Sequence, residues 1–233
     1  MSAKTPLILL PGLLLDTALW THQIKNLDDI ADMTVAELTH DDSIEGMAER
    51  TLTRAPDTFA LAGLSMGGYV AQEMVRKAPD RIERLALLDT SARPDSPEQK
   101  KIRKSLMKQV QVGRFRGVTT RLLPLLIHED RFDDEDIVDT IMSSAENVGK
   151  EAYLHQQQAI LSRPDTRKNL KNISCPTLVL CGRQDILTPV DLHEEMAGKI
   201  PNASLIVIED CGHLSTLENP DAVNAAMRSW LTE

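Results

Sequence analysis

The sequence is poor in several features, and each shortage excludes a class of protein. Aromatic residues make up only 3% of the 233 residues, so a folded core must be built mainly from Leu, Ile, Val, Ala and Met. No apolar run approaches the roughly 18 residues of a membrane-spanning helix. Lys and Arg (26) are outnumbered by Asp and Glu (35), and the net charge of −9 argues against a protein that binds nucleic acid.

Cysteine is scarce as well. Cys175, Cys181 and Cys211 are an odd number, and their spacing is not typical of a metal site. Such cysteines suit reduced thiols in the core of a cytoplasmic protein. The first residues, M-S-A-K-T-P-L-I-L-L-P-G, also lack the charged and then apolar leader of an exported protein. We therefore expect a cytoplasmic protein that binds neither a metal ion, a membrane nor nucleic acid.

Apolar runs that alternate with amphipathic stretches make up most of the sequence. The short runs are typical of buried strands, and an apolar residue at every third or fourth position is typical of a helix. Strands are expected over residues 5–10, 33–38, 59–64, 82–88, 177–181 and 204–208, and helices over residues 17–27, 43–55, 189–200 and 219–231. This alternation predicts an α/β fold with a mostly parallel sheet and helices on both faces.

The alternation is interrupted once. No strand is evident from residue 93 to residue 172, where Pro and Gly separate four helical stretches. These are expected over residues 97–112, 117–127, 134–147 and 151–162. We interpret residues 1–92 and 173–233 as an α/β core and residues 93–172 as a helical lid inserted into it.

One short stretch joins a strand to a helix through a serine. The run F-A-L-A-G-L-S-M-G-G, residues 59–68, is followed at once by helical periodicity. Gly63 and Gly67 permit a sharp bend, because a Cβ atom at either position would clash with the strand or helix it folds against. Ser65 is therefore expected at the tip of the bend, which is the strand–turn–helix context of a nucleophile elbow.

A serine hydroxyl attacks an ester only if a neighbouring base removes its proton. Only His213 lies in a loop directly after a late buried strand. The other histidines are interpreted as surface or structural residues, and among them His155 is kept as a candidate because lid helices face the substrate. The base in turn needs a carboxylate to orient it. Asp185, in the loop after strand 177–181, is favoured over Asp89 at the end of strand 82–88.

The attack also creates an oxyanion, which two preorganised N–H donors must stabilise. The backbone amide of Met66 is the first candidate, because it follows the serine at a helix N-terminus. The second donor should come from the loop after the first strand. There Leu13, directly after Gly12, is favoured over Leu14.

Together these stretches resemble the α/β-hydrolase superfamily over essentially the whole chain. The matching residues are L-L-P-G-L-L-L-D-T-A-L-W, G-L-S-M-G-G-Y-V-A-Q, C-G-R-Q-D-I-L-T-P and C-G-H-L-S-T-L-E-N-P, in the order serine, aspartate, histidine. The sequence is most similar to small carboxylesterases, 3-oxoadipate enol-lactonases and pimeloyl-carrier-protein methyl esterases. This resemblance implies an acyl-enzyme intermediate and no cofactor.

The resemblance has two departures. Pro11-Gly12 stands where many relatives carry His-Gly, so a contribution from that histidine side chain is absent. The chain also has no room for the antiparallel hairpin that opens the sheet of the superfamily, which implies about six strands. Serine at position 65 argues against dehalogenase or epoxide hydrolase chemistry, which uses aspartate at the elbow.

The lid carries a basic run with no acidic residue between positions 100 and 121. It comprises Lys100, Lys101, Arg103, Lys104, Lys108, Arg114, Arg116 and Arg121. A solvated helix face explains such a run. The alternative is a docking site for an anionic carrier, such as an acyl carrier protein or a coenzyme A thioester.

We therefore predict a carboxylesterase for small to medium esters. Ser65 attacks, His213 transfers the proton and Asp185 orients His213, while the Met66 and Leu13 amides stabilise the oxyanion. The alternatives that use the same site are hydrolysis of an enol-lactone, a thioester, a carrier-linked methyl ester or a C–C bond, and acyl transfer or perhydrolysis. A ligand receptor on a hydrolase fold is the alternative outside the enzymes.

Overall fold

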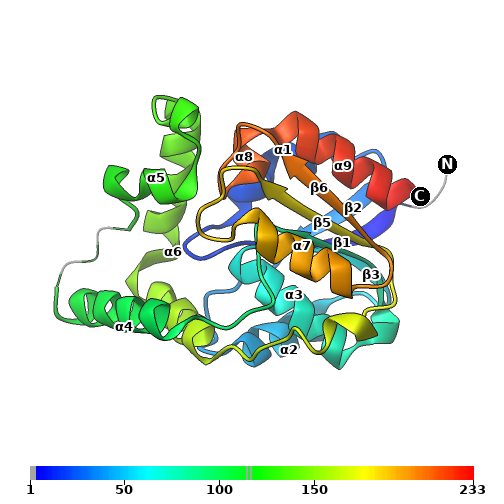
Figure 1. The fold of residues 1–233 in the computed structure, drawn as a ribbon, viewed down its shortest axis with the longest axis horizontal. Helices are drawn as coiled ribbons and strands as arrows, with labels where there is room; N and C mark the ends of the chain where they lie inside the picture. The colour runs from blue at the N-terminus through cyan, green and yellow to red at the C-terminus, as the bar shows by residue number, and fades with distance from the viewer. Residues whose placement is uncertain (1–3, 114, 116) are drawn as a thin grey trace.

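A six-stranded sheet forms the centre of the molecule (Figure 1). The computed structural model describes residues 4–113, 115 and 117–233. The strands are β1 (Thr5–Leu10), β2 (Ala31–Val35), β3 (Phe59–Leu64), β4 (Ile82–Leu88), β5 (Thr177–Gly182) and β6 (Ala203–Ile208). They pair in the order β2-β1-β3-β4-β5-β6, and every pair is parallel. The predicted parallel sheet of about six strands is confirmed.

The second strand lies earlier in the chain than predicted, over Ala31–Val35 rather than residues 33–38. Leu38 is buried, but in the loop that follows β2, where it packs into the core. Its carbonyl oxygen accepts a hydrogen bond from the Gln156 side chain and not from a neighbouring strand. The predicted strand was wrong at this end because a buried loop residue and a buried strand residue have the same apolar character.

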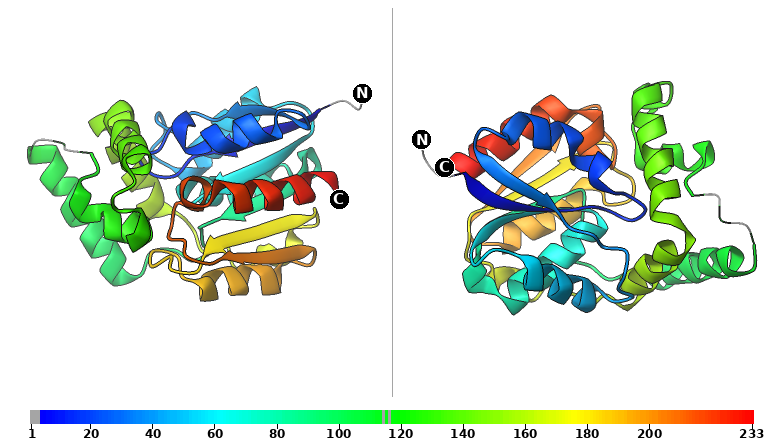
Figure 2. Two further views of the ribbon diagram at one scale, coloured as in Figure 1. Left: turned by 90° about the horizontal axis from the view of Figure 1, so that it is seen from above. Right: turned by 180° about the vertical axis from the view of Figure 1, so that it is seen from behind.

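Helices cover both faces of the sheet, as predicted (Figure 2). One face packs against α1 (Thr21–Leu27) and α9 (Pro220–Thr232), and the other against α2 (Ile44–Arg54), α3 (Met66–Lys77) and α7 (Val190–Lys199). Side chains of successive strand residues point to opposite faces. In β1, accordingly, Leu7 and Leu9 join one apolar cluster and Ile8 and Leu10 join the other. Each helix layer thus has its own core.

Three further helices lie beside the sheet, in the segment that we interpret as a lid (Figure 1). They are α4 (Pro97–Val112), α5 (Leu123–Leu126) and α6 (Glu135–Ser162). They lie within the segment 93–172 that we interpret as an insertion, whose limits stay a prediction. The loops after β1 and β6 form hydrogen bonds to this lid, so it covers the carboxyl ends of the strands. Within the described ranges no helix is both long and apolar enough to cross a membrane.

One predicted lid helix differs in the structure, and a predicted break between two others is found as a kink. The stretch 117–127 forms only a 3₁₀ turn, Thr120–Leu122, and the short α5. Pro124 has no amide hydrogen, so a helix through residues 117–127 would lose a hydrogen bond there. The stretches 134–147 and 151–162 follow one another in α6, whose backbone is not helical at Gly149, where φ is 78°. The predicted break at Gly149 is therefore where the structure has a kink between two helical halves.

Candidate active site

The serine lies where the strand–helix bend was predicted. Ser65 follows β3 and precedes α3 directly, and its own φ of 53° is unusual for a residue with a side chain. A Cβ atom on Gly63 would lie 2.4 Å from the Gly67 carbonyl oxygen. One on Gly67 would lie 2.1 Å from the Leu10 carbonyl oxygen. Glycine is needed at both positions because the new helix crosses the strand ends at backbone contact distance.

Three side chains from three different loops meet at this bend. The Oγ atom of Ser65 lies 2.9 Å from Nε2 of His213. On the other side of the imidazole, Nδ1 lies 2.8 Å from Oδ2 of Asp185. His213 follows β6, Asp185 follows β5, and both are buried. The structure therefore brings together the three residues that the sequence analysis selected.

The opposite charges of His213 and Asp185 favour the ionised forms of both side chains. Burial opposes the imidazolium form of His213, but the adjacent Asp185 carboxylate outweighs burial and raises the pKa of His213. Burial also opposes the charge of Asp185. The charge of His213 and hydrogen bonds from Thr188 nevertheless lower the pKa of Asp185. Asp185 thus remains a carboxylate that can stabilise a protonated His213.

The alternative acid, Asp89, uses its oxygens on backbone and hydroxyl donors, whereas Asp185 contacts the imidazole. One of its oxygens accepts a hydrogen bond from the Gly182 amide (3.1 Å), and the other accepts from the amide and the hydroxyl of Ser215 (3.2 and 2.5 Å). Burial, followed by the charge of Asp185, raises the pKa of Asp89 well above its usual range. Asp89 ties the Asp185 loop to the His213 loop.

The two proposed oxyanion donors both lie beside Ser65. Met66 is the first residue of α3, so its amide has no acceptor within the helix. A Cβ atom on Gly12 would lie 3.4 Å from Cβ of Ser65, which places the loop after β1 against the nucleophile. In that loop the Leu14 amide donates to Oε1 of Gln156 at 3.0 Å and is therefore occupied. This contact favours Leu13 over Leu14.

The sequence analysis missed the carboxylate that shapes the His213 loop. Glu218 is buried in α8 (Ser215–Glu218), and its oxygens accept hydrogen bonds from three backbone amides, those of His128, Gly212 and Leu214. The His213 amide also donates to the Leu126 carbonyl oxygen of the lid. A glutamate so close to a predicted base was a signal, but its burial was not visible in the sequence.

Two further histidines are bound to backbone groups. His193 is buried and accepts a hydrogen bond from the Thr90 amide, and burial lowers its pKa to about 4. His155, the lid candidate, contacts the Thr39 carbonyl oxygen through Nδ1. Burial raises the pKa of the Cys211 thiol, which is unsuited to act as a nucleophile. In the described part of the chain, no cluster of three or more His, Cys, Asp or Glu side chains could hold a metal ion.

Such an arrangement can perform acyl transfer. A serine beside an imidazole, a carboxylate on the far side of that imidazole and two candidate amide donors near the serine are what attack on a carbonyl carbon requires.

Comparison with known proteins identifies the family and the fold. A sequence model of the alpha/beta hydrolase family matches residues 10–226. A thermophilic esterase from Thermogutta terrifontis is 32% identical, with a TM-score of 0.88 over 99% of this chain and 90% of its own. An enol-lactonase from Burkholderia xenovorans is 25% identical, with a TM-score of 0.90 over 100% and 93% of the two chains.

A pimeloyl-[acyl-carrier protein] methyl ester esterase from Nitrosomonas europaea is also similar. It is 27% identical over 77% of this chain and 74% of its own length. The thermophilic esterase and the enol-lactonase share the fold described above, and the match to the family model covers nearly the whole chain. The chain belongs to the alpha/beta hydrolase family.

Proposed function

We propose that the protein is a serine hydrolase that cleaves carboxylic esters of small to medium acyl compounds. The observation that carries this proposal is the continuous contact from Ser65 through His213 to Asp185. The names of similar proteins, an esterase, an enol-lactonase and a methyl ester esterase, support it. A cytoplasmic location remains our prediction.

The proposed reaction has two halves. Oγ of Ser65 attacks the ester carbonyl carbon while Nε2 of His213 takes the hydroxyl proton, and Asp185 stabilises the imidazolium. The amides of Met66 and Leu13 stabilise the oxyanion of the tetrahedral intermediate. Collapse of this intermediate expels the alcohol, which receives the proton from His213. A water molecule, deprotonated by His213, then attacks the acyl-enzyme, and His213 returns the proton to Oγ of Ser65 as the acid is released.

Hydrolysis of p-nitrophenyl esters, from acetate to decanoate, tests the proposal. The wild type should release p-nitrophenol, with an optimum that measures the length of acyl chain the site accepts. Ser65→Ala should lose turnover by about 10⁶-fold, because the nucleophile is gone. A fluorophosphonate should label the wild type and not the variant.

Two outcomes would contradict the proposal. Labelling of Ser65 without turnover of any ester would favour a lactone, a thioester or a C–C substrate. Neither labelling nor turnover would favour the receptor alternative.

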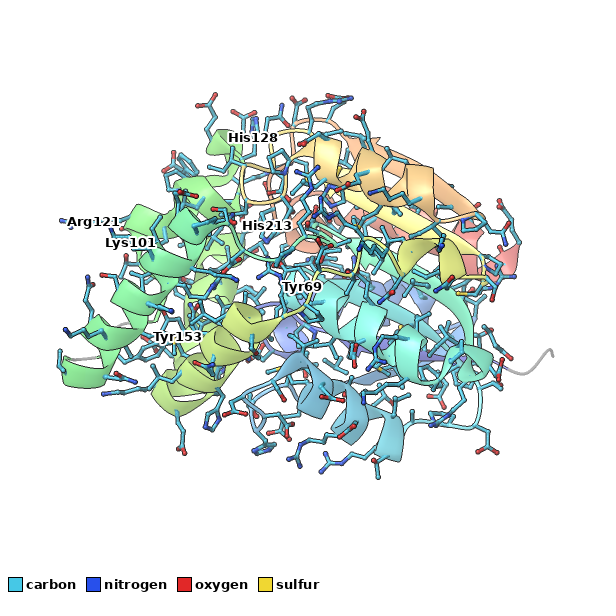
Figure 3. The ribbon with its side chains drawn as sticks, turned by 60° about the horizontal axis from the view of Figure 1, so that its bottom comes forward. Tyr69, Lys101, Arg121, His128, Tyr153 and His213 are labelled. Atoms are coloured by element: carbon cyan, nitrogen blue, oxygen red, sulfur yellow. The ribbon has the colours of Figure 1, made fainter. Side chains whose placement is uncertain are left out.

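A carrier-linked ester is the second candidate, because one face of α4 is basic. Lys101, Lys104 and Lys108 are exposed at helical spacing, and Figure 3 shows Lys101 and Arg121 at the outer edge of the lid. Arg103 is not part of this face, since it binds Asp95 and Gln157. Arg114 and Arg116, which belong to the predicted basic run, lie outside the described residues.

Reversing the charge of lysines on α4 tests whether an anionic carrier docks there. With an acyl carrier protein ester as substrate, Lys104→Glu/Lys108→Glu should raise KM, and added salt should do the same in the wild type. Turnover of p-nitrophenyl acetate should not change, because that ester carries no charge. Equal kinetics of the variant and the wild type on the carrier-linked ester would exclude docking on α4.

A further inference from the structure

We infer that the lid helix α6 holds the oxyanion-hole loop in place, and that Gln156 is the positioning residue for the Leu13 amide. The oxyanion loop comprises residues 12–16, between β1 and the 3₁₀ turn Thr17–Trp20. The inference rests on the proposed function, because it concerns the stabilisation of the oxyanion. It assigns to the lid a part in catalysis besides covering the substrate.

Gln156 joins the oxyanion loop to the core. Its side chain is buried, with an exposed fraction of 1%. Oε1 accepts a hydrogen bond from the Leu14 amide at 3.0 Å, and Nε2 donates to the Leu38 carbonyl oxygen at 3.0 Å. Both ends of the amide group are therefore used, and its orientation is fixed by two backbone segments that are distant in sequence.

The loop that Gln156 holds has a backbone conformation that needs support. Leu14 has a φ of 60°, in the left-handed region that residues with a side chain seldom adopt. The carbonyl oxygen of Gly12 accepts a hydrogen bond from the Leu15 amide at 3.2 Å. In a trans peptide the carbonyl and the next amide point in opposite directions, so this bond also sets the direction of the Leu13 amide. Gln156 fixes the adjoining peptide between Leu13 and Leu14.

The other end of the oxyanion loop is also bound to α6. Asp16 caps the following 3₁₀ turn through the Ala18 amide, and its oxygens accept hydrogen bonds from Ser144 Oγ (2.9 Å) and Asn147 Nδ2 (3.1 Å). These two residues precede the kink at Gly149, and Gln156 follows it. Both halves of α6 thus hold the loop, and a displacement of α6 would displace the oxyanion donor.

The consequence is specific to the transition state. Without Gln156 the Leu14 amide loses its acceptor, and the left-handed turn loses the contact that supports it. The orientation of the Leu13 amide would then no longer be fixed, so its hydrogen bond to the oxyanion would weaken. Binding of the neutral ester would change little. This pattern differs from general damage to the lid.

The test compares Gln156→Met and Gln156→Glu with the matched control Gln157→Met in the full chain. Gln157 neighbours Gln156 on α6 and is equally buried, but its side chain binds Arg103 of α4. The first readout is the rate constant for labelling of Ser65 by a fluorophosphonate, whose phosphonyl oxygen also needs the oxyanion donors. The second readout is kcat and KM for a p-nitrophenyl ester.

We expect Gln156→Met to lower both the labelling rate and kcat by roughly 10- to 100-fold, less than or similar to the loss of a whole oxyanion donor. KM should stay within about twofold of the wild-type value. Gln156→Glu keeps an acceptor for the Leu14 amide but, when ionised, has no donor for the Leu38 carbonyl oxygen. Its labelling rate relative to the wild type at the same pH should therefore rise as the pH is lowered and the carboxyl group is protonated. Gln157→Met should behave like the wild type.

Several results would overturn the inference. They are an unchanged labelling rate in Gln156→Met, an equal loss in Gln157→Met, and a loss confined to KM. If Gln156→Met does not fold, Ser144→Ala/Asn147→Ala removes the lid bonds to Asp16 instead, and an unchanged labelling rate there would also refute the inference. Labelling of the wild type without ester turnover refutes the proposed function alone, whereas an unlabelled wild type refutes both.

Discussion

His213 is surrounded by acidic groups, and its protonation sets the activity of the proposed enzyme. Besides Asp185, the charges of Asp89 and Glu218 raise the pKa of His213 against the effect of burial. Ser65 can give up its proton only to a neutral imidazole. The acidic surroundings therefore strengthen the base and narrow the pH range in which it works.

We expect kcat/KM to fall as the pH drops through the pKa of His213. The midpoint should lie above 6.5, the usual value, because the pKa is raised. The same shift stabilises the folded protein below about pH 6.5, and this contribution is lost as the pH rises through the folded-state pKa. Kinetics with a p-nitrophenyl ester across the range from about pH 5 to pH 9 measure the midpoint. A midpoint at or below 6.5 would contradict the expectation.

Substitution by asparagine distinguishes the two buried acids. Asp185→Asn should lower kcat by about 10³- to 10⁴-fold, because the amide cannot hold the imidazole in the required tautomer. Asp89→Asn should mainly destabilise the fold, by about 1–3 kcal/mol, since its NH₂ group must face a backbone or hydroxyl donor. Steady-state kinetics and urea unfolding of both variants measure the two effects. A larger loss of kcat in Asp89→Asn would reverse the assignment of the catalytic acid.

At the scale of elements, the bend between β3 and α3 depends on close backbone contact. The helix begins directly at the strand end, and the virtual Cβ atom of Gly67 falls on the backbone of β1. In α7, by contrast, a Cβ atom on Gly198 would meet nothing within 4 Å. Packing therefore requires glycine at position 67 and leaves room for a side chain at position 198.

Gly67→Ala should prevent folding or lower the melting temperature strongly, because the Leu10 carbonyl oxygen cannot move without breaking the sheet. Gly198→Ala should raise the free energy of unfolding by up to about 1 kcal/mol, the helix preference of alanine over glycine. Thermal and urea unfolding of both variants test this contrast. Gly67→Ala as stable as the wild type would show that the elbow is less tightly packed than the structure indicates.

At the scale of the whole molecule, the lid leaves and rejoins the core at one place. The Thr166 amide donates to the Ala92 carbonyl oxygen at 3.0 Å, so the two connecting segments are joined. Asp95, whose side chain is buried, lies between Arg163 (2.7 Å) and Arg103 (2.8 Å). One carboxylate thus links the outgoing segment, the returning segment and α4.

Asp95→Ala should destabilise the lid attachment, by about 3 kcal/mol, because two arginines lose a buried partner. Asp165→Ala is the matched control. Its pair with Arg167 is partly exposed, so the loss should stay below about 1 kcal/mol. Urea unfolding measures both, and limited proteolysis shows whether the lid loosens first. Equal effects of the two substitutions would contradict a special role of Asp95.

The sequence by itself determined the sheet, the bend at Ser65 and the loops that carry Asp185 and His213. Buried strands and a strand–helix bend are local patterns, and the carboxyl ends of parallel strands meet at one edge of a sheet, which brings distant loops together. The interpretation of the basic run in the lid as one exposed face, in contrast, was wrong for Arg103, whose side chain binds Asp95.

Only the tertiary structure decided what holds the oxyanion loop. Asp89 and Asp185 both follow buried strands; the sequence favoured Asp185, and the structure places Asp185 against His213. Gln156 reaches Leu14 across 142 positions of the chain, and Glu218 reaches His128 across 90. Such contacts depend on how the lid packs on the sheet. The periodicity of the sequence reports which face of an element is apolar, and it contains no information on the partner of a single buried polar side chain.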